Sequence, residues 1–308
     1  MKPVAFPYAE AMAEKGFWQA SRFQILRRVS QLVFLALFLS GPFTGVWIAK
    51  GTLASSLTLG VLPLTDPFIL LQSLAARHWP ETTALLGSVL VLAAYTVLGG
   101  RAYCSWVCPI NAVTDASGWL GTKFEIKANT KLWPKWRSAF LIAALAGSAL
   151  TGTIVWELIN PITAFHRTLL FGSLFGLYLA LAIFLFDLFV VRDGWCGHLC
   201  PVGAFYGLVG KAALVRVAVP RRQACDDCMA CYAVCPEPHV ITPALKGERT
   251  GTGPVILSGD CTNCGGCIDA CPERVFAFTH RFNHSIDELA TAAAHSAAQN
   301  TPSGRAAS

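Results

Sequence analysis

Residues 225–236 read CDDCMACYAVCP, and residues 261–272 read CTNCGGCIDACP. Both contain the spacing C-x2-C-x2-C-x3-C-P, which is typical of bacterial ferredoxins that carry two iron–sulfur clusters. Zinc knuckles or a disulfide framework fit less well, because structural zinc sites favour C-x2-C units separated by a longer spacer. The sequence therefore predicts a C-terminal α+β domain of ferredoxin type, over residues 220–282, with two [4Fe–4S] clusters.

The ligands of the two clusters are expected to cross between the runs. Three thiolates of each run reach one cluster, whereas the fourth, held by the turn before proline, binds the other. Gly265 and Gly266 let the backbone pack close to the second cluster, since they have no Cβ. The predicted ligands are Cys225, Cys228, Cys231 and Cys271 for cluster I, and Cys261, Cys264, Cys267 and Cys235 for cluster II.

The chain before these runs is strongly apolar. Hydrophobic residues make up 54% of its 308 residues and charged residues 14%, well below the proportion of charge usual in soluble domains. Four runs of 19 to 21 uncharged residues can each cross about 30 Å of hydrocarbon as a helix. The predicted spans are residues 29–49, 82–100, 138–156 and 168–186. The predicted organisation is an N-terminal cytoplasmic segment (1–28), an all-α membrane domain of four transmembrane helices (29–202), a linker (203–219), the ferredoxin-like domain (220–282) and a disordered tail (283–308).

Lys and Arg residues alternate in number between the segments that flank these spans. From the N-terminus onward the counts are five, two, six, one and ten. Because cytoplasmic loops carry the excess of Lys and Arg, both termini are expected in the cytoplasm. The cysteine runs then lie in a reducing compartment, where disulfides are disfavoured. The net charge of +6 follows from this topology, and no nucleic-acid partner is expected.

Two shorter cysteine motifs mark an internal repeat. Residues 100–109 read GRAYCSWVCP and residues 192–201 read RDGWCGHLCP, each a C-x3-C-P at the end of an even-numbered span. The four spans are therefore interpreted as two copies of a helix pair, related by an axis along the membrane normal. Their thiols can hold a further metal or iron–sulfur centre, form two redox-active dithiols, or simply pack as small core residues. The four cysteines are Cys104, Cys108, Cys196 and Cys200.

Together these features resemble the NapH family of polyferredoxin-like membrane proteins. The resemblance covers nearly the whole chain and includes LRR at 26–28, LSGP at 39–42, PLTDP at 63–67, GSALTGT at 147–153 and CPEPHV at 235–240. It implies the membrane subunit of a quinol dehydrogenase in the bacterial inner membrane. Such a subunit oxidises quinol and passes electrons through a periplasmic ferredoxin-type partner, NapG, to periplasmic nitrate reductase. It is an oxidoreductase component and not the terminal reductase.

Three ionisable residues near the outer ends of the helix pairs are candidates for the quinol site. Oxidation of quinol releases two protons, so it needs an ionisable group beside an apolar slot. Asp66 and His166 occupy near-equivalent places in the two copies, and Glu157 is close to the second. The alternative is that each is an interfacial residue in contact with water.

Two other functions remain open at this stage. One is a MauN-type ferredoxin of methylamine use, or a maturation or repair factor, that supplies cytoplasmic electrons to a periplasmic metalloenzyme. The other is a structural anchor whose clusters only stabilise the fold. The MauN type is the hardest alternative to distinguish from the NapH family, since MauN-type proteins have nearly the same length as this chain.

Overall fold

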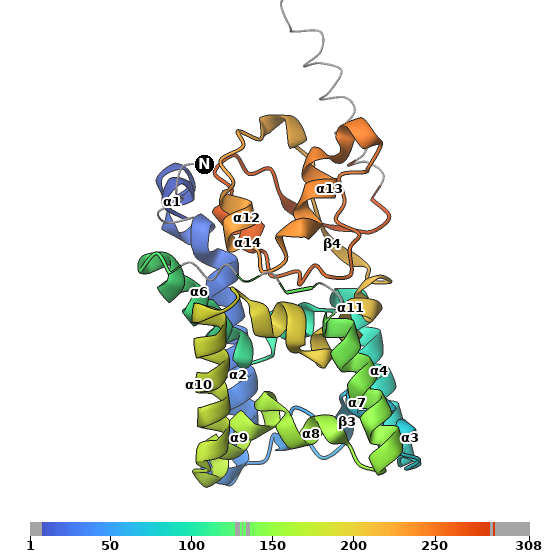
Figure 1. Ribbon diagram of the computed structural model, residues 1–308. Coiled ribbons are helices and arrows are strands. Elements are labelled where there is room, and N and C mark those ends of the chain that lie inside the picture. Colours follow the sequence, from blue (N-terminus) through green and yellow to red (C-terminus); the bar gives the residue numbers. More distant parts are fainter. Residues whose placement is uncertain (1–7, 127–129, 131, 134–135, 284–285, 287–308) are drawn as a thin grey trace, which may run out of the picture.

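The computed structural model describes residues 8–126, 130, 132–133, 136–283 and 286. A bundle of upright helices carries the cysteine-rich domain on one end (Figure 1). Four helices form the uprights: α2 (Phe17–Thr44), α4 (Thr82–Leu98), α7 (Trp136–Thr151) and α10 (Leu174–Phe189).

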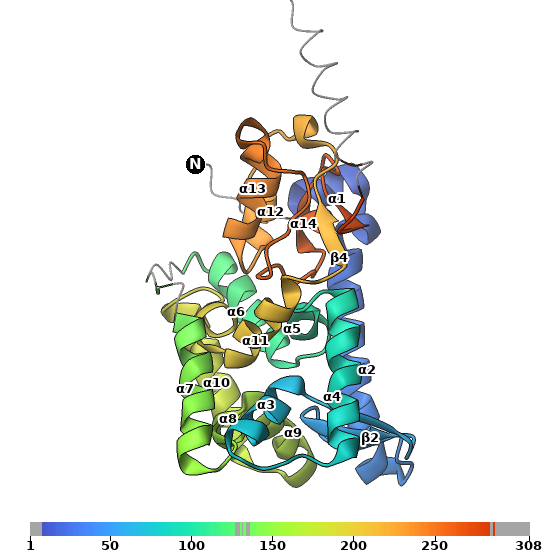
Figure 2. The same cartoon turned by 90° about the vertical axis from the view of Figure 1, so that its right-hand side faces the viewer.

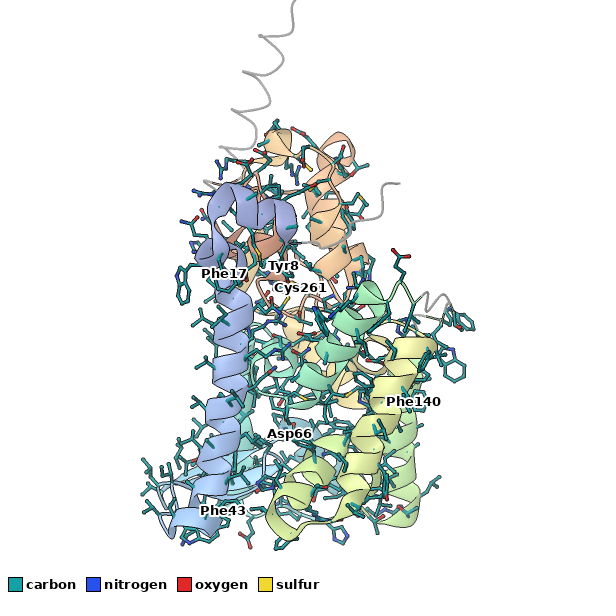
Figure 3. The ribbon with its side chains drawn as sticks, turned by 90° about the vertical axis from the view of Figure 1, so that its left-hand side faces the viewer. Tyr8, Phe17, Phe43, Asp66, Phe140 and Cys261 are labelled. Atoms are coloured by element: carbon teal, nitrogen blue, oxygen red, sulfur yellow. The ribbon has the colours of Figure 1, made fainter. Side chains whose placement is uncertain are left out.

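Each upright helix overlaps one predicted span. Among the described residues only α2 is long and apolar enough to cross a membrane by length and composition; α4, α7 and α10 are apolar but have 17, 16 and 16 residues. Large apolar side chains face outward along the bundle. Phe17 and Phe43, near the two ends of α2, are 64% and 71% exposed and point away from the other helices (Figure 3).

A small sheet lies at one side of the far end of the bundle, opposite the cysteine-rich domain (Figure 2). Strands β1 (Ala49–Gly51), β2 (Ser55–Thr58) and β3 (Leu62–Thr65) pair in antiparallel order β1-β2-β3. Leu59 and Gly60 have φ values of 52° and 72°, which form the tight turn between β2 and β3. The prediction of an all-helical membrane domain is therefore wrong over these strands. The left-handed turn at Leu59 and Gly60 folds this apolar stretch into a hairpin instead of a helix.

Two short helices at this end of the bundle begin in the same way. Helix α3 (Pro67–Ala75) begins after Asp66, whose Oδ1 accepts from the N–H of Phe68 at 3.0 Å. Helix α9 (Pro161–Phe171) begins after Asn160, whose Oδ1 accepts from the N–H of Ile162 at 3.1 Å. Each helix thus has a capping side chain followed by proline at its first position. The counterpart of Asp66 is Asn160 rather than His166. Helix α8 (Val155–Ile159) precedes α9.

The C-x3-C-P motifs lie where the bundle meets the cysteine-rich domain. Helix α5 (Ala102–Trp106) and the π-helix η1 (Trp195–Leu199) carry the first cysteine of each motif. The prolines lead into α6 (Ile110–Lys123) and α11 (Pro201–Gly210). Helix α6 packs on α10, α11 packs on α4 and α7, and α5 packs on α2 and α4, so these connections tie the four upright helices together.

The cysteine-rich domain is built around a two-stranded antiparallel sheet, in which β4 (Val215–Ala218) pairs with β5 (Ala277–His280). Its helices are α12 (Ala230–Val234), α13 (Ile241–Lys246) and α14 (Gly266–Ala270), with 3-10 turns η2 (Arg222–Ala224), η3 (Pro238–Val240) and η4 (Gly247–Thr250). Residues 203–219, predicted as a linker, contain most of α11 and β4. The predicted tail lies outside the described residues apart from 283 and 286.

The N-terminal helix belongs to the cysteine-rich end. Helix α1 (Ala9–Lys15) packs beside α14, and the Nζ of Lys15 donates to the carbonyls of Ile268 and Asp269 at 2.9 and 2.8 Å. The buried Asp269 carboxylate accepts from the N–H groups of Phe23 and Gln24 on α2, at 2.9 and 3.0 Å. The start of the chain therefore holds the second cysteine run against the bundle.

Candidate functional site

The structure gathers the eight ferredoxin-type cysteines around two cavities. One cavity is lined by the first three cysteines of the first run and the last cysteine of the second. The other is lined by the last cysteine of the first run and the first three of the second. The cysteines thus group in the crossed arrangement that the spacing predicts, and their role as cluster ligands stays a prediction. The cavity sets are Cys225, Cys228, Cys231 and Cys271 for cluster I, and Cys235, Cys261, Cys264 and Cys267 for cluster II.

The loops around these cysteines wrap inward through left-handed backbone positions. In the first run Asp227 and Met229 have φ values of 61° and 65°; the equivalent residues of the second run, Asn263 and Gly265, have 49° and 73°. A Cβ on Gly265 would lie 2.5 Å from the Cγ of Phe23, so glycine here also lets α2 approach the second run.

The surroundings of the thiols fit iron–sulfur clusters. The N–H of Gly266 lies 3.4 Å from the Sγ of Cys264, and the N–H of Val275 lies 3.5 Å from the Sγ of Cys271. Hydrogen bonds to the sulfurs are among the interactions that set cluster potential. Each run therefore offers four thiols and backbone donors around a space that a cluster would fill.

A third cavity lies between α5 and η1. It is lined by all four cysteines of the C-x3-C-P motifs. The rest of its wall is apolar or aromatic and includes Tyr103, Trp156 and Trp195. The structure thus brings Cys104, Cys108, Cys196 and Cys200 to one place, as the repeat predicted.

Arg101 joins this third cavity to the cluster II cavity. Its side chain is 1% exposed, and its Nη1 lies 2.6 Å from the Oε1 of Glu237, two residues after Cys235. Nη1 also donates to the carbonyl of Asp260 at 2.9 Å, and Nη2 to the carbonyl of Cys196 at 3.1 Å. One buried cation therefore contacts backbone or side-chain atoms at or next to cysteines of both quartets.

Hydrogen bonds from α5 strengthen this junction. The Oγ of Ser105 donates to the carbonyl of Thr262 at 2.8 Å, and the Nε1 of Trp106 to the carbonyl of Asn263 at 3.1 Å. Burial by itself would raise the pKa of Asp260, but the neighbouring Arg137 and Arg101 hold that pKa below its ordinary value. The loop that carries Cys261 is therefore fixed directly on the bundle, as its position in Figure 3 shows.

The three candidate quinol residues lie apart from the cysteines and do not bond to one another among the described residues. Asp66 is 8% exposed and accepts a hydrogen bond from the hydroxyl of Tyr206 at 3.2 Å. His166 is 2% exposed, and its ring packs edge-on against Phe38. Its two ring nitrogens have no hydrogen-bond partner in the part of the chain that the structure describes. Glu157 accepts from the Nδ2 of Asn160 at 2.7 Å. Asp66 and His166 are buried, contrary to the alternative of water-exposed interfacial residues.

Aromatic rings connect Asp66 with the third cavity. The ring of Tyr206 stacks on that of Tyr103, with 5.2 Å between centroids and 21° between planes. Tyr103 lines the third cavity. A continuous contact therefore runs from the Asp66 carboxylate through two tyrosines to the C-x3-C-P cysteines.

A further, open hollow lies between α1, α2, α6 and the cysteine-rich domain. Arg27 and Asp115 line it and lie 3.4 Å apart. The other charged residues in its wall are Lys123, Glu125, Arg192 and Asp193.

Several residues that shape the site were missed by the sequence analysis. Arg101 was counted only as a topological charge, and Glu237 and Tyr206 were given no role. Asp187 is 2% exposed, and its Oδ1 accepts from the N–H of Trp195 at 2.9 Å, which holds the start of η1. The one sequence signal that could have identified Arg101 is its position just before a cysteine motif. Its partners, Glu237 and the carbonyls of Asp260 and Cys196, become apparent only in the fold.

Comparison with known proteins agrees with these sites. A family model described as "4Fe-4S binding domain" matches residues 82–127 and 173–222, and one described as "4Fe-4S dicluster domain" matches residues 224–275. No solved structure matches the chain.

Full-length relatives carry two different names. The chain is 46% identical to the "Ferredoxin-type protein NapH" of Haemophilus influenzae over 91% of this chain and 97% of the relative. It is 47% identical to the protein of that name from Escherichia coli K12, over 89% and 95%. It is 53% identical to the "Methylamine utilization ferredoxin-type protein MauN" of Methylorubrum extorquens AM1, over 90% and 96%. The chain therefore belongs to the family of ferredoxin-type iron–sulfur proteins that includes NapH and MauN.

Proposed function

We propose that this chain is the membrane iron–sulfur subunit of a quinol dehydrogenase. It takes electrons from quinol in the bacterial inner membrane and delivers them through a periplasmic NapG-like ferredoxin-type partner to periplasmic nitrate reductase. The observation that carries this proposal is the position of the ferredoxin-like domain, which sits directly on an apolar helical bundle and is joined to it through Arg101. When bound, the clusters supply one-electron transfer.

We infer a multi-pass topology with both termini in the cytoplasm. At 17 and 16 residues, α4 and α7 are each about 25 Å long, so α3, α5 and α9 at the helix ends extend the apolar thickness toward that of a bilayer. Outward-facing leucines on three helices, Leu86, Leu150 and Leu177, are 56%, 88% and 51% exposed, which suits a lipid-facing surface. The alternation of Lys and Arg along the sequence supports the orientation.

We also infer that the bundle is a repeat of two helix pairs. One family model matches both halves, and each half has a capped helix beginning with proline, Asp66-Pro67 in one and Asn160-Pro161 in the other. Each half then ends in a C-x3-C-P motif whose proline opens a helix. These parallels support a common origin of the two halves. They also support a pseudo-twofold axis, along the membrane normal, that relates one half to the other.

Asp66 is the residue we assign to accept a proton from quinol. Its carboxylate is buried among apolar side chains, and the Tyr206 hydroxyl holds one oxygen in place. His166 and Glu157 flank the same end of the bundle and are assigned to proton release. The large hollow near Arg27 is a poorer quinol site, because its charged wall suits water or a polar ligand better than an isoprenoid chain.

A redox titration tests this function. The full chain, purified without oxygen and placed in lipid nanodiscs, is mixed with menaquinol or ubiquinol analogues, and cluster reduction is followed by EPR. We expect one of the quinols to give the signal of reduced clusters. Failure of both quinols, with full reduction by dithionite in the same sample, would contradict quinol oxidation.

A second function deserves the same assay because one observation favours it. The loop of the first run is open to solvent, with Asp226, Asp227 and Met229 exposed beside Cys225 and Cys228. A soluble cytoplasmic donor would reach cluster I there, as a maturation or repair factor or a MauN-type ferredoxin requires. Reduced flavodoxin is the probe. Rapid reduction by flavodoxin, together with no reduction by quinol, would favour this second function.

A further inference from the structure

We propose that the open hollow between α1, α2, α6 and the cysteine-rich domain binds the phosphate of a phospholipid headgroup. Its wall combines a buried arginine with exposed charged and aromatic side chains. The inference rests on the proposed position of the bundle in the membrane, and it does not depend on quinol. The residues that carry it are Arg27, Asp115, Trp119, Lys123 and Arg192.

Arg27 is buried in this wall without a full set of partners. It is 7% exposed, and its Nε has no hydrogen-bond partner in the part of the chain that the structure describes. Its Nη2 lies 3.4 Å from the Oδ2 of Asp115, and Arg28 contacts the same oxygen more closely. One carboxylate therefore serves two guanidinium groups, which leaves positive charge in excess. Because buried charged groups are normally paired, an anion in the hollow would complete this arrangement.

The other charges of the wall leave the same excess. Arg192 is paired, with its Nε 3.5 Å from the Oδ2 of Asp193. Lys123 has no carboxylate partner among the described residues, and its Nζ lies over the ring of Trp119, 5.0 Å from the centroid. Counted together with Arg28, the basic side chains outnumber the acidic ones by four to three: Arg27, Arg28, Lys123 and Arg192 against Asp115, Glu125 and Asp193.

The hollow lies at the height of the lipid headgroups in the proposed topology. Arg27 comes just before the first predicted span, and Arg192 follows α10, which ends at Phe189. Tyr8, another residue of the wall, lies at the junction of the bundle and the cysteine-rich domain in Figure 3. Basic pockets at the cytoplasmic ends of transmembrane helices are typical sites for phosphate headgroups.

The wall and its surroundings suit an amphiphile better than a free anion. Trp119 is 52% exposed, and Phe124, which follows α6, is 64% exposed. Such rings are typical of the boundary between water and hydrocarbon, and the stem of a lysine commonly covers apolar surface there. A guanidinium presents its N–H groups in a planar fork that matches phosphate oxygens. Arg27 would thus hold the phosphate, while the acyl chains continue along the apolar outside of the bundle.

A lipid in this position would also join separate parts of the chain. Besides α1, α2 and α6, the wall contains Val234 and Pro236, which flank Cys235 in the first cysteine run. The headgroup would therefore contact both the bundle and the loop of a predicted cluster ligand. Because a ligand that binds only the folded state stabilises it, bound lipid should raise the temperature at which the clusters lose their visible absorbance.

Lipid titration of the full chain, purified in detergent and stripped of lipid, tests the site by native mass spectrometry. Phosphatidylglycerol is the probe, and diacylglycerol with the same acyl chains is the ligand control without phosphate. We expect Arg27→Gln to weaken binding of the first phosphatidylglycerol by about tenfold or more, the loss typical of a hydrogen bond to a charged group. Arg22→Gln, an exposed residue of the same helix outside the hollow, should keep the wild-type affinity. Diacylglycerol should not distinguish the three proteins.

Equal affinities of the wild type and Arg27→Gln for phosphatidylglycerol would overturn the site. Binding of inorganic phosphate that depends on Arg27, without any such dependence for the lipid, would overturn the lipid as its source. Should Arg27→Gln fail to fold, Lys123→Ala on an exposed side chain replaces it, with an expected loss of about twofold to fivefold and wild-type affinity as the contradicting result. Reporter fusions test the topology separately, so missing lipid binding with the expected topology refutes only this site.

Discussion

Arg101 and Glu237 form a buried ion pair, with 2.6 Å between Nη1 and Oε1, although 136 positions separate them in the sequence. Arg137 contacts the same carboxylate oxygen at 2.8 Å. The three side chains join the bundle to the cysteine-rich domain at the edge of the cluster II cavity. Because both cations contact this one carboxylate, and only Arg137 also pairs with the Asp260 carboxylate, the junction is sensitive to substitution of Glu237.

Glu237→Ala should weaken the junction strongly. It leaves the guanidinium of Arg101 buried without its partner, which typically costs about 3–5 kcal/mol. The measurement is the temperature at which detergent-solubilised protein loses the visible absorbance of its clusters. Glu248→Ala, on an exposed side chain, is the matched control and should change stability by less than about 0.5 kcal/mol. Equal loss temperatures for the two variants would show that the pair does not hold the domains together.

Substitution of single ferredoxin-type cysteines should remove clusters one at a time. Cys228→Ser is expected to lose cluster I, and Cys264→Ser cluster II, each with a drop of about four irons. EPR of the reduced variants distinguishes which signal disappears. Thr242→Ala, on an exposed residue outside both cavities, should keep every signal. If either cysteine variant retains the full spectrum, the ligand assignment fails.

Reporter fusions should reveal an alternating topology. Fusions after Ala76 and His166 are expected in the periplasm, and fusions after Lys127 and His280 in the cytoplasm, because the Lys and Arg counts alternate along the chain. Paired alkaline phosphatase and green fluorescent protein reporters at each position provide opposite readouts. A periplasmic signal after His280 would reverse the orientation.

Asp66→Asn should separate the capping role of this residue from its role with quinol. Asparagine caps a helix as well as aspartate does, so α3 should remain folded. It cannot accept a proton at neutral pH, and we expect quinol-dependent cluster reduction to slow by about 100-fold or more. Reduction by dithionite is the internal control and should not change. A wild-type rate with quinol would remove Asp66 from the site.

Gly259→Ala should displace the loop that carries Cys261. A Cβ at this position would lie 2.1 Å from the carbonyl oxygen of Gly207 on α11. The backbone must therefore move apart, and limited proteolysis should cut the cysteine-rich domain from the bundle sooner. Gly118→Ala is the control, since the nearest atom to its Cβ is 3.9 Å away, and it should digest at the wild-type rate.

The predictions from sequence were most accurate for features that depend on the spacing of residues close together in the chain. The crossed quartets and the C-x3-C-P pair follow from short motifs, and the structure groups the cysteines accordingly. Apolar runs located the upright helices, but their ends shifted: α10 begins at Leu174 rather than at Thr168, because Gly172 ends α9 with a φ of 68°. The β1–β3 sheet was not predicted, since its strands are short and lie within an apolar stretch.

Long-range partners could not be read from one sequence. Nothing near Arg101 indicates that its charge is balanced by Glu237, or that Tyr206 donates to Asp66 across 140 positions. The comparison of Asp66 with His166 also failed, because the helix-capping role passes to Asn160 in the second half. Such pairings depend on how the two halves pack, and only the folded structure contains that information.

The contact between Lys15 and α14 has a consequence for how the protein is made. The residues that meet there are separated by about 254 positions, so α1 leaves the ribosome long before its binding surface exists. In the topology proposed above, the upright helices enter the bilayer while the first segment is still undocked in the cytosol. If the second run binds its cluster as proposed, iron and sulfide can reach it only late in synthesis, and α1 can dock on α14 only after that run has been made.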